Sequence, residues 1–356
     1  MNLARAHHLM VRALQDRQFS GAVLLVEHGG EIVFHVPYGT VGGEGARQVE
    51  ESTLFDLASL TKVFATTPAW MLLAGGDTEI LDSPISNWFC DVPPDKTSIT
   101  PRHLLAHTSG LPAWRPYYLM QFAGDRLAAT CERILTEPLA YPVGTGCVYS
   151  DLGFILLGRI AGMETGSSLD RFCSERIFSP LGLDHDLMFT PTRVAERIAV
   201  TRVGEPAGLV NDLNARSLGG AAGHAGLFGT ARAVASLAAT IVKSRVGKDR
   251  FFSAHVVREF CERIDFVSGC TRALGFDTPS EEGSSSGRFF SHRSIGHTGF
   301  TGTSVWIDLD REVTVVLLTN RVIMGEADRR IKDFRPLLHD AIMSALGVRS
   351  CFLTNA

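Results

Sequence analysis

Long apolar runs, dense clusters of one charge and paired cysteine spacings are all missing from this 356-residue sequence. The longest apolar runs, such as Val313 to Leu318, are far shorter than the ~20 residues that cross a bilayer, so we expect no membrane span. The formal net charge is only −4, and no group of Lys and Arg is dense enough to follow a phosphate backbone. A nucleic-acid partner therefore has no support in the sequence.

The first twenty residues contain no continuous apolar centre, so they do not look like a signal peptide and favour an amphipathic surface helix. The seven cysteines are odd in number and widely scattered, which suits a reducing compartment better than a disulfide framework. We therefore expect a cytoplasmic protein. An apolar fraction of 45% and a charged fraction of 20% are typical of an ordinary globular protein with one large domain or two closely packed ones.

Strand signals are concentrated near the two ends of the chain. Residues 21–27 and 31–36 form two short β-type runs around Gly29 and Gly30, which predicts a hairpin. Residues 302–309 and 312–319 predict a second hairpin. Helix signals dominate between them. The expected fold class is α/β (α+β), with an antiparallel sheet built from both chain ends and flanked by helices, and a mostly helical inserted domain.

This pattern places residues 1–76 and 215–356 in the sheet domain and residues 77–214 in the helical domain, with an active site between them. The loop at residues 281–291 is rich in Gly and Ser, and we expect it to border the cleft and to influence substrate choice more than folding.

The most informative short pattern is Ser59-x-x-Lys62, at the start of an expected apolar helix. If the helix begins near Ser59, the two side chains share one face. A desolvated lysine can remove the proton from a serine hydroxyl, and the helix N-terminus favours an oxyanion formed by its attack. The alternative is that Ser59 only caps the helix and Lys62 is solvated. Pro68 should kink or weaken the helix.

Two further patterns lie downstream. Tyr149 precedes an expected helix together with Ser150 and Asp151, and its phenol can exchange a proton with a nucleophile. Alternatively, Tyr149 packs at a domain junction and Asp151 caps that helix. The segment containing His297, Thr298, Gly299 and Phe300 opens the second hairpin, where a free backbone N–H can contribute to an oxyanion hole.

Taken in order, Ser-x-x-Lys, Tyr-Ser-Asp and His-Thr-Gly resemble the serine β-lactamase and penicillin-binding superfamily, and most closely its class C β-lactamase, D,D-peptidase and esterase branch. The similarity also includes residues 104–111, 211–228 and 301–320. It implies the β-lactamase/transpeptidase-like fold, with Ser59 as the acylated nucleophile, Lys62 as its proton partner and Tyr149 as a second acid/base group. The backbone N–H groups of Ser59 and Phe300 match the family's oxyanion hole.

Two departures from the family pattern affect the expected substrate. Asp151 replaces the usual asparagine, and His297 replaces the lysine of Lys-Thr-Gly with a side chain only partly charged near neutrality. Both changes disfavour anionic β-lactams. We expect a serine hydrolase acting on small neutral esters or amides, with weak or no β-lactamase activity, without cofactor or metal. A true class C-type β-lactamase or D,D-peptidase is the alternative. For each of these functions, the residues expected to contact the substrate are Asp151, His297, Thr298, Gly299 and Phe300.

The sequence has two alternative interpretations from other functional classes, a zinc hydrolase and a ligand-binding protein. His103 and His107 lie four residues apart as in zinc proteases, but the glutamate that would activate water is missing, so His107 is better explained as a hydrogen-bonded structural residue. A catalytically degenerate, ligand-binding family member is the other alternative. It would be expected to lack Ser59, Lys62 or Tyr149, and all three are present.

Overall fold

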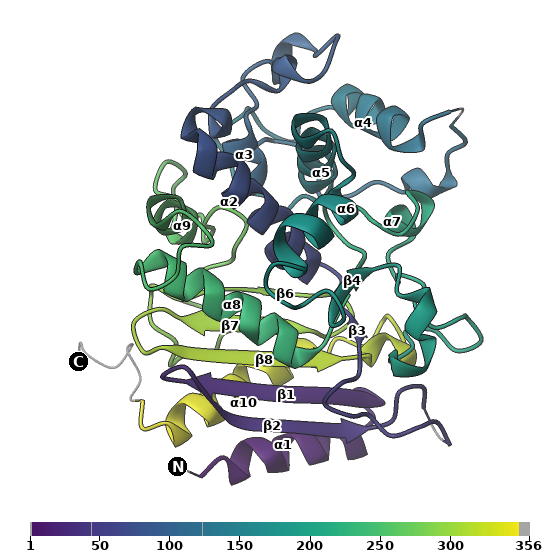
Figure 1. Cartoon of the computed structure of the whole chain (residues 1–356), viewed down its shortest axis with the longest axis vertical. Helices are drawn as coiled ribbons and strands as arrows, with labels where there is room; N and C mark the ends of the chain where they lie inside the picture. The colour runs from purple at the N-terminus through teal and green to yellow at the C-terminus, as the bar shows by residue number, and fades with distance from the viewer. Residues whose placement is uncertain (1, 44, 123, 349–356) are drawn as a thin grey trace.

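The computed structural model describes residues 2–43, 45–122 and 124–348. Its centre is a five-stranded antiparallel sheet in the order β2-β1-β8-β7-β6, built from both ends of the chain as the sequence predicts (Figure 1). The strands are β1 (Gly21–His28), β2 (Glu31–Gly39), β6 (Ile295–Thr298), β7 (Ser304–Asp308) and β8 (Val313–Thr319). Strand β1 pairs with β2 on one side and with β8 on the other.

The predicted Gly-Gly hairpin joins β1 and β2. Gly29 and Gly30 have φ angles of 61° and 84°, and two consecutive positive values match the twist that a tight hairpin turn requires. Strand β1 is buried on both faces, because alternate side chains enter two different hydrophobic clusters. Val23 and Leu25 belong to the larger cluster, whereas Leu24 and Val26 belong to the smaller one. The sheet therefore separates two cores.

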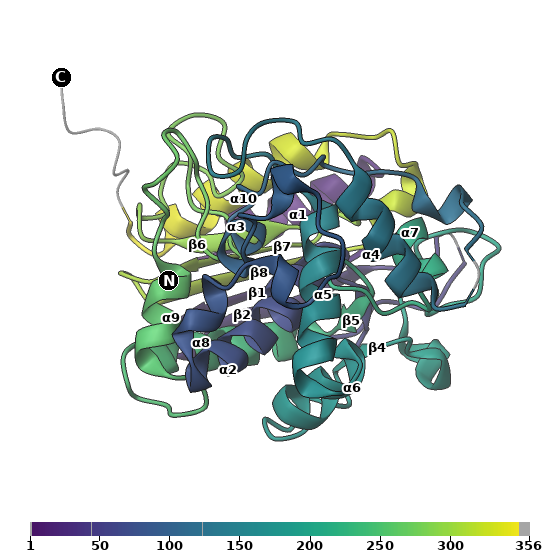
Figure 2. The same ribbon diagram turned by 90° about the horizontal axis from the view of Figure 1, so that it is seen from above.

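Helices cover both faces of this sheet. Helices α1 (Ala4–Gln15) and α10 (Ile331–Ala345) lie together on one face and enclose the smaller cluster (Figures 1 and 2). Helix α8 (Ala231–Arg245) lies on the opposite face, against β1 and β8. Helix α1 agrees with the amphipathic helix predicted near the N-terminus.

The remaining helices form the mostly helical part of the molecule. They are α2 (Thr67–Gly76), α3 (Pro101–Leu105), α4 (Arg126–Thr136), α5 (Asp151–Thr165), α6 (Leu169–Cys173), α7 (Leu213–Ser217) and α9 (Ala254–Cys261). Short 3-10 turns occupy Thr78–Leu81, Ile85–Asn87, Pro94–Lys96, Tyr117–Leu119, Thr192–Arg197 and Arg321–Met324. A second, three-stranded sheet has the order β3-β5-β4, formed by β3 (Phe55–Asp56), β5 (Leu227–Gly229) and β4 (Leu187–Phe189). Among the described residues, no helix is both long and apolar enough to cross a membrane.

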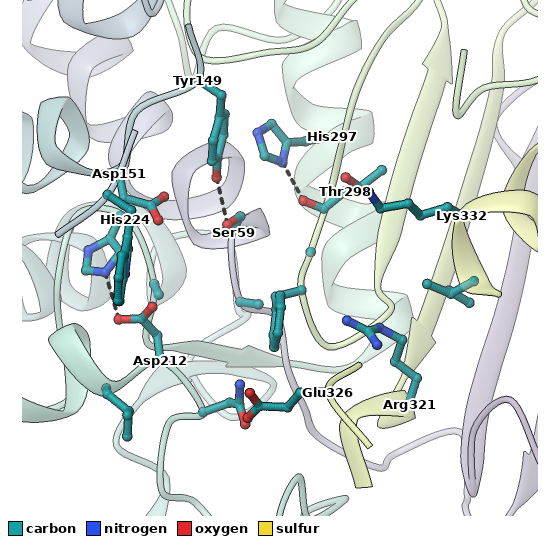
Figure 3. Close-up of a pocket in the computed structure, with 18 of the residues that line it drawn as sticks. Ser59, Tyr149, Asp151, Asp212, His224, His297, Thr298, Arg321, Glu326 and Lys332 are labelled. Atoms are coloured by element: carbon teal, nitrogen blue, oxygen red, sulfur yellow. Dashed lines mark hydrogen bonds and ion pairs between the residues drawn. The ribbon is translucent and has the colours of Figure 1, made fainter. Parts of the chain in front are cut away.

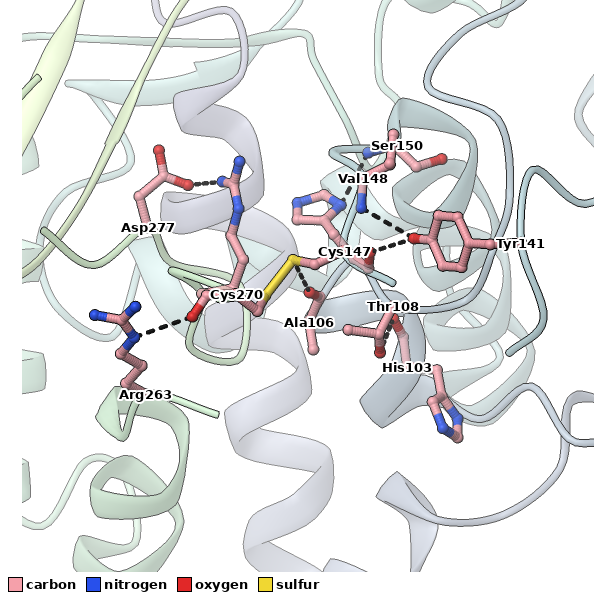
Figure 4. Close-up of a disulfide and its surroundings, with 12 residues drawn as sticks. His103, Ala106, Thr108, Tyr141, Cys147, Val148, Ser150, Arg263, Cys270 and Asp277 are labelled. Carbon is pink, nitrogen blue, oxygen red and sulfur yellow. Dashed lines mark hydrogen bonds and ion pairs between the residues drawn. A yellow bond between two sulfur atoms is a disulfide. The ribbon is translucent and has the colours of Figure 1, made fainter. Parts of the chain in front are cut away.

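The expectation that the cysteines stay reduced is wrong for one pair. Cys147 and Cys270 form a disulfide across 123 residues of sequence, with their Cα atoms 5.8 Å apart (Figure 4). Sequence spacing could not reveal this pair, because the fold brings the two segments together. The scatter of cysteines is therefore no argument for a reducing compartment.

The expectation that residues 281–291 border the cleft is also wrong. None of these residues lines the cavity described below. Phe290 is buried beside Trp306 and His339, and Arg288 forms an ion pair with Asp340 of α10. The end of the loop is therefore anchored between α10 and β7, away from the cavity lining. Its influence on substrate choice stays a prediction.

Candidate active site

Ser59 lies in a tight turn directly after strand β3. Ala58, the residue before it, has a φ of 49°, a left-handed conformation that is unfavourable for a non-glycine residue. The carboxylate of Asp56 supports this turn by accepting hydrogen bonds from the Ala58 N–H at 2.8 Å and the Asn211 N–H at 2.6 Å. Burial raises the pKa of Asp56 to about 6, against the effect of these two hydrogen bonds.

The helix after Ser59 begins with a wide turn. Residues Lys62–Thr66 are π-helical, and the Thr67 N–H donates to the Lys62 carbonyl five residues earlier. Pro68 lies in the first turn of α2, where it has no N–H to donate, so the irregularity predicted from this proline occurs just before it. The turn brings Lys62 Nζ to 3.2 Å from Ser59 Oγ, as predicted from their spacing.

Lys62 is fully buried and is not a solvated charge. Its Nζ also donates to Asp151 Oδ1 at 2.7 Å and to the His224 carbonyl at 3.0 Å. Burial lowers the pKa of Lys62, because the charged ammonium is desolvated, and the nearby Asp151 carboxylate partly opposes this shift. Asp151 therefore faces Lys62, while Ser150 caps α5 by accepting from the Gly153 N–H.

Tyr149 approaches Ser59 from the other side. Its hydroxyl lies 2.8 Å from Ser59 Oγ (Figure 3). Burial raises the pKa of Tyr149 well above its ordinary value and Asp151 raises it further, whereas Ser59 and Arg272 lower it. Ser59 Oγ is thus held between an amine and a phenol. Loss of one proton from this trio creates the base that serine needs, and burial favours losing it from Lys62.

His297 is a neutral side chain in this structure. It is buried on β6, and its Nδ1 lies 2.8 Å from the Thr298 carbonyl, which can only accept a hydrogen bond. Burial holds the pKa of His297 well below its ordinary value, and the neighbouring Lys62 and Arg272 lower it further. The partial charge expected from sequence is therefore absent.

The end of β6 packs closely against the Ser59 turn. A Cβ at Gly299 would lie 2.1 Å from Thr303 Oγ1 and 2.8 Å from the Leu57 carbonyl, so glycine is required here. Thr301 and Thr303 donate their hydroxyls to the Asp56 and Leu57 carbonyls at 2.8 and 3.2 Å. These bonds fix the β6–β7 turn to the residues immediately before the serine.

Two backbone donors remain available beside Ser59. Within residues 2–43, 45–122 and 124–348, neither the Ser59 N–H nor the Phe300 N–H donates a hydrogen bond. Buried Arg335 binds the carbonyls of Gly299 and Thr303 at 2.8 and 2.7 Å and so supports the loop that holds Phe300. The Ser59 N–H lies on the turn after β3, and the Phe300 N–H lies on the β6–β7 turn. The hydrogen bonds of Thr301 and Thr303 join these two turns.

All of these groups surround a cavity of about 610 Å³. The structure brings every predicted site residue to it. Those lining the cavity are Ser59, Tyr149, Asp151, His297, Thr298, Gly299 and Phe300, and Lys62 lies directly behind Ser59. The predicted separation of the chain at residues 76/77 and 214/215 stays a prediction.

Several lining residues were missed from the sequence. Arg272 forms an ion pair with Asp277, and His224 Nε2 pairs with Asp212 Oδ1 at 2.9 Å. A basic wall, comprising Arg321, Arg329 and Lys332, lines another part of the cavity. Figure 3 shows Arg321 and Lys332 of this wall. None of these residues belongs to a short pattern, and only the fold places them near Ser59.

The two histidines weighed as zinc ligands have other partners. His103 Nδ1 lies 2.9 Å from Thr100 Oγ1 at the start of α3. His107 Nδ1 accepts from the Ser150 N–H at 3.0 Å, which confirms the prediction that His107 is a hydrogen-bonded structural residue. Over the described part of the chain, no group of three or more His, Cys, Asp or Glu side chains could hold a metal ion.

Comparison with known proteins agrees with this geometry. The family described as Beta-lactamase matches residues 7–338. A protein of Escherichia coli K12 named for D-alanyl-D-alanine carboxypeptidase activity is 32% identical over 353 residues, covering 88% of this chain and 81% of the relative. An N-acetylmuramyl-L-alanine amidase of Bacillus subtilis is 33% identical over 346 residues, covering 85% of this chain and 77% of the relative.

Solved structures share the fold at lower identity. EstCE1, a hydrolase with promiscuous acyltransferase activity, superposes with a TM-score of 0.73 at 23% identity, covering 96% of this chain and 98% of its own. A class C β-lactamase from Rhodobacter sphaeroides gives a TM-score of 0.73 at 19% identity, with 96% and 99% coverage. The fold is therefore the β-lactamase/transpeptidase-like fold, and the chain belongs to the Beta-lactamase family of serine hydrolases.

Proposed function

We propose that this serine hydrolase cleaves small, uncharged esters and amides through an acyl-enzyme on Ser59, and that it hydrolyses β-lactams poorly. The observation that carries the proposal is the position of Ser59 Oγ, 3.2 Å from Lys62 Nζ and 2.8 Å from the Tyr149 hydroxyl. Both groups are within the range over which a general base removes a proton.

Acylation begins when Ser59 Oγ attacks the carbonyl carbon of the substrate and its proton passes to the Lys62–Tyr149 pair. The carbonyl oxygen becomes an oxyanion, and the Ser59 and Phe300 N–H groups donate to it. The C–O or C–N bond then breaks, and the leaving group takes a proton back from the pair. Water attacks the acyl-enzyme by the same route: the Lys62–Tyr149 pair accepts its proton and returns one to Ser59 Oγ as the acid is released.

The proposed preference for uncharged substrates is based on His297 and Asp151. His297 supplies no positive charge to attract a substrate carboxylate, because its Nδ1–H is donated to Thr298 and burial keeps the ring neutral. Asp151 accepts from Lys62 and has no N–H to donate to an acyl side chain. Both features weaken recognition of the anionic bicyclic β-lactams.

Covalent labelling tests the nucleophile directly. We expect a fluorophosphonate probe to modify Ser59, identified by mass spectrometry of the labelled peptide, and Ser59→Ala to abolish the adduct. Ser109→Ala and Ser150→Ala serve as controls and should keep it. An adduct on Ser109 or Ser150, or labelling that survives in Ser59→Ala, contradicts the proposal. A parallel screen of short-chain nitrophenyl esters, D-amino-acid amides and a chromogenic cephalosporin then tests the substrate class.

One observation favours a second candidate, a carboxypeptidase that recognises the free carboxylate of its leaving group. Arg329 and Lys332 are exposed cations on the cavity wall, and Arg321 stands beside them with its guanidinium carbon 5.0 Å from the centre of the Phe300 ring. Such a wall can attract a carboxylate. The relative named for D-alanyl-D-alanine carboxypeptidase activity supports testing this reaction.

The two candidates differ in how they treat a terminal charge. A carboxypeptidase should cleave a peptide ending in D-Ala-D-Ala faster than the same peptide with a terminal carboxamide. In the double variant Arg329→Gln/Lys332→Gln this preference should fall severalfold, whereas Arg293→Gln, outside the cavity, should keep it. An equal loss on both peptides, or no preference in the wild type, favours the neutral ester and amide substrates.

A further inference from the structure

The disulfide joins two segments that each carry a site residue two positions further on. Cys147 precedes Tyr149, and Cys270 precedes Arg272, so one covalent bond links the segment that carries the phenol to the segment that carries the guanidinium (Figure 4). The Cα atoms of the two cysteines are 5.8 Å apart. Such a bond restricts how far Arg272 can move from Tyr149.

Arg272 faces Tyr149 across a short distance. Its guanidinium carbon lies 5.5 Å from the centre of the Tyr149 ring, and only 19% of its side chain is exposed. Asp277 holds the guanidinium from behind through an ion pair. Asp277 is itself fixed to β6, because its N–H and carbonyl both bond to Gly296 at 2.7 and 2.9 Å. Arg272 is thus a partly buried cation with a defined orientation.

Tyr149 and Lys62 are surrounded by several titratable groups, of which few are cations. The titratable and charged groups that face it or its partner Lys62 are Lys62, His107, Asp151, Asp212, Arg272, Asp277 and His297. Burial keeps the pKa of His107 and of His297 well below the ordinary value, so both rings are neutral at neutral pH. Arg272 is therefore the cation in this group that complements Lys62.

Arg272 acts in the same direction on both members of the proton-accepting pair. Burial, Asp151 and Asp212 have larger effects on the pKa of Lys62, but the Arg272 charge also lowers it, and it lowers the pKa of Tyr149 against burial. A positive charge at this place favours removal of one proton from the Ser59–Lys62–Tyr149 trio, whichever side chain loses it. The neutral His297 provides no such assistance.

We propose that Arg272 is a positioning residue that stabilises the singly deprotonated trio, and that the Cys147–Cys270 disulfide holds it there, so that reductive opening of this bond slows acylation of Ser59. The proposal rests on the acyl-enzyme function proposed above. Opening the bond with a dithiol produces two cysteine thiols and the oxidised, cyclic disulfide of the reagent.

The segment around Cys270 has enough other support for opening to loosen the site without unfolding it. Arg263 donates to the Cys270 carbonyl at 3.0 Å, and the Thr278 N–H donates to the Thr271 carbonyl at 2.9 Å. On the other side, the Val148 N–H donates to the Tyr141 hydroxyl at 2.9 Å. We therefore expect a displacement of Arg272 relative to Tyr149 and a partial loss of rate.

The test measures the rate of covalent labelling of Ser59 by a fluorophosphonate as a function of pH, which requires no knowledge of the substrate. Arg272→Gln should label roughly tenfold more slowly at pH 6.5 and within about twofold of the wild type at pH 9, because higher pH removes the proton without assistance. Arg272→Lys should restore most of the rate. Asp277→Asn should label faster at pH 6.5, because it leaves the guanidinium uncompensated.

The disulfide is tested in the same assay. Wild type treated with a dithiol, and the double variant Cys147→Ser/Cys270→Ser, should both label about threefold more slowly at pH 6.5. The dithiol should have no further effect on that double variant or on Arg272→Gln. Cys90→Ser, which changes an exposed free cysteine, should match the wild type with and without dithiol.

Three results would overturn the inference. The first is an equal loss in Arg272→Gln at pH 6.5 and pH 9, which would indicate a merely structural role. The second is slower labelling in Asp277→Asn at pH 6.5, and the third is an unchanged rate after the bond is shown to be open by thiol alkylation. Absence of any Ser59 adduct in the wild type would instead contradict the proposed function, so the two failures are distinguishable.

Discussion

His297 shows how burial changes the charge expected of a histidine. From the sequence it is a cation that is partly charged near neutrality, but in the structure it is neutral and bonded to its neighbour's carbonyl. Its Nε2 lies 3.9 Å from Asp277 Oδ1. A lysine at this position would therefore have a carboxylate nearby to retain its charge, and it would restore the missing cation of Lys-Thr-Gly.

We predict that His297→Lys raises the ratio of kcat/KM for a penicillin or cephalosporin to that for a neutral ester. One partly screened charge contact contributes about 1 kcal/mol, so the ratio should rise severalfold to roughly tenfold. The measurement uses both substrates at low and moderate salt. An unchanged ratio, or a wild type that already prefers cephalosporins, contradicts this interpretation of His297.

Asp151 gives a second prediction at the same scale. Its carboxylate raises the pKa of Lys62 and of Tyr149, so it opposes loss of a proton from the trio. In Asp151→Asn, labelling of Ser59 at pH 6 should become severalfold faster. The exposed carboxylate variant Glu282→Gln is the control and should leave the rate unchanged. Slower labelling at pH 6 together with an unaltered melting temperature would show that Asp151 assists the chemistry instead.

The junction between β6 and the Ser59 turn depends on a residue without a side chain. A Cβ at Gly299 would meet Thr303 Oγ1 and the Leu57 carbonyl, so Gly299→Ala must separate β6 from the turn that holds the nucleophile. We expect a loss of about 1–3 kcal/mol in unfolding free energy and a loss of Ser59 labelling. Gly76→Ala is the matched control, because a Cβ there meets nothing within 4 Å. Denaturant unfolding and labelling on both variants check the prediction, and equal behaviour of the two would contradict it.

Helices and strands were predictable from the sequence where adjacent residues determine them. The β1–β2 hairpin was predictable because two adjacent glycines supply its turn. The capped start of α3 was predictable for a similar reason, since Thr100 and Pro101 are adjacent in sequence. Residues 281–291 were misjudged from their Gly and Ser content, because Phe290 packs in the smaller core and Arg288 pairs with Asp340.

For the molecule as a whole, we expect acid stability to depend on the Asp212 carboxyl at the edge of the site. Burial alone would raise the pKa of Asp212, but His224 and the Ala215 N–H lower it to about 2, below its ordinary value of 3.8. A carboxyl with a depressed folded-state pKa contributes stability above its unfolded value and loses it as pH falls through the folded one. This contribution is about 2 kcal/mol, present above pH ~4 and lost towards pH ~2.

We therefore predict that Asp212→Asn lowers the unfolding free energy at pH 5 by about 2 kcal/mol and reduces the further loss between pH 5 and pH 2.5. Denaturant unfolding at both pH values gives the comparison. Asp249→Asn, which changes a carboxyl in the α8–α9 connection, should keep the wild-type slope with pH. A wild-type slope in Asp212→Asn would show that other carboxyls control the acid transition.

The candidate site was predictable only where its residues belong to short patterns. Ser59, Lys62 and Tyr149 were predicted because spacing and flanking residues identify them. Arg272 and the disulfide were not, because Cys147 and Cys270 are 123 residues apart and nothing local links them. Their proximity is a property of the assembled fold, and it places a cation where the His-Thr-Gly pattern lacks one.

The interior position of β1 in the sheet has a consequence for the order of folding. Its partner β8 is made about 290 residues after it, with Ala22 opposite Thr319. Until β8 and α10 are made, α1 is the only one of the two enclosing helices available to cover Leu24 and Val26, and one edge of the hairpin has unpaired backbone groups. A nascent chain released before residue 313 therefore exposes an unpaired strand edge that can pair with another chain. Rapid completion of the sheet, or binding by a chaperone, would protect this edge from aggregation.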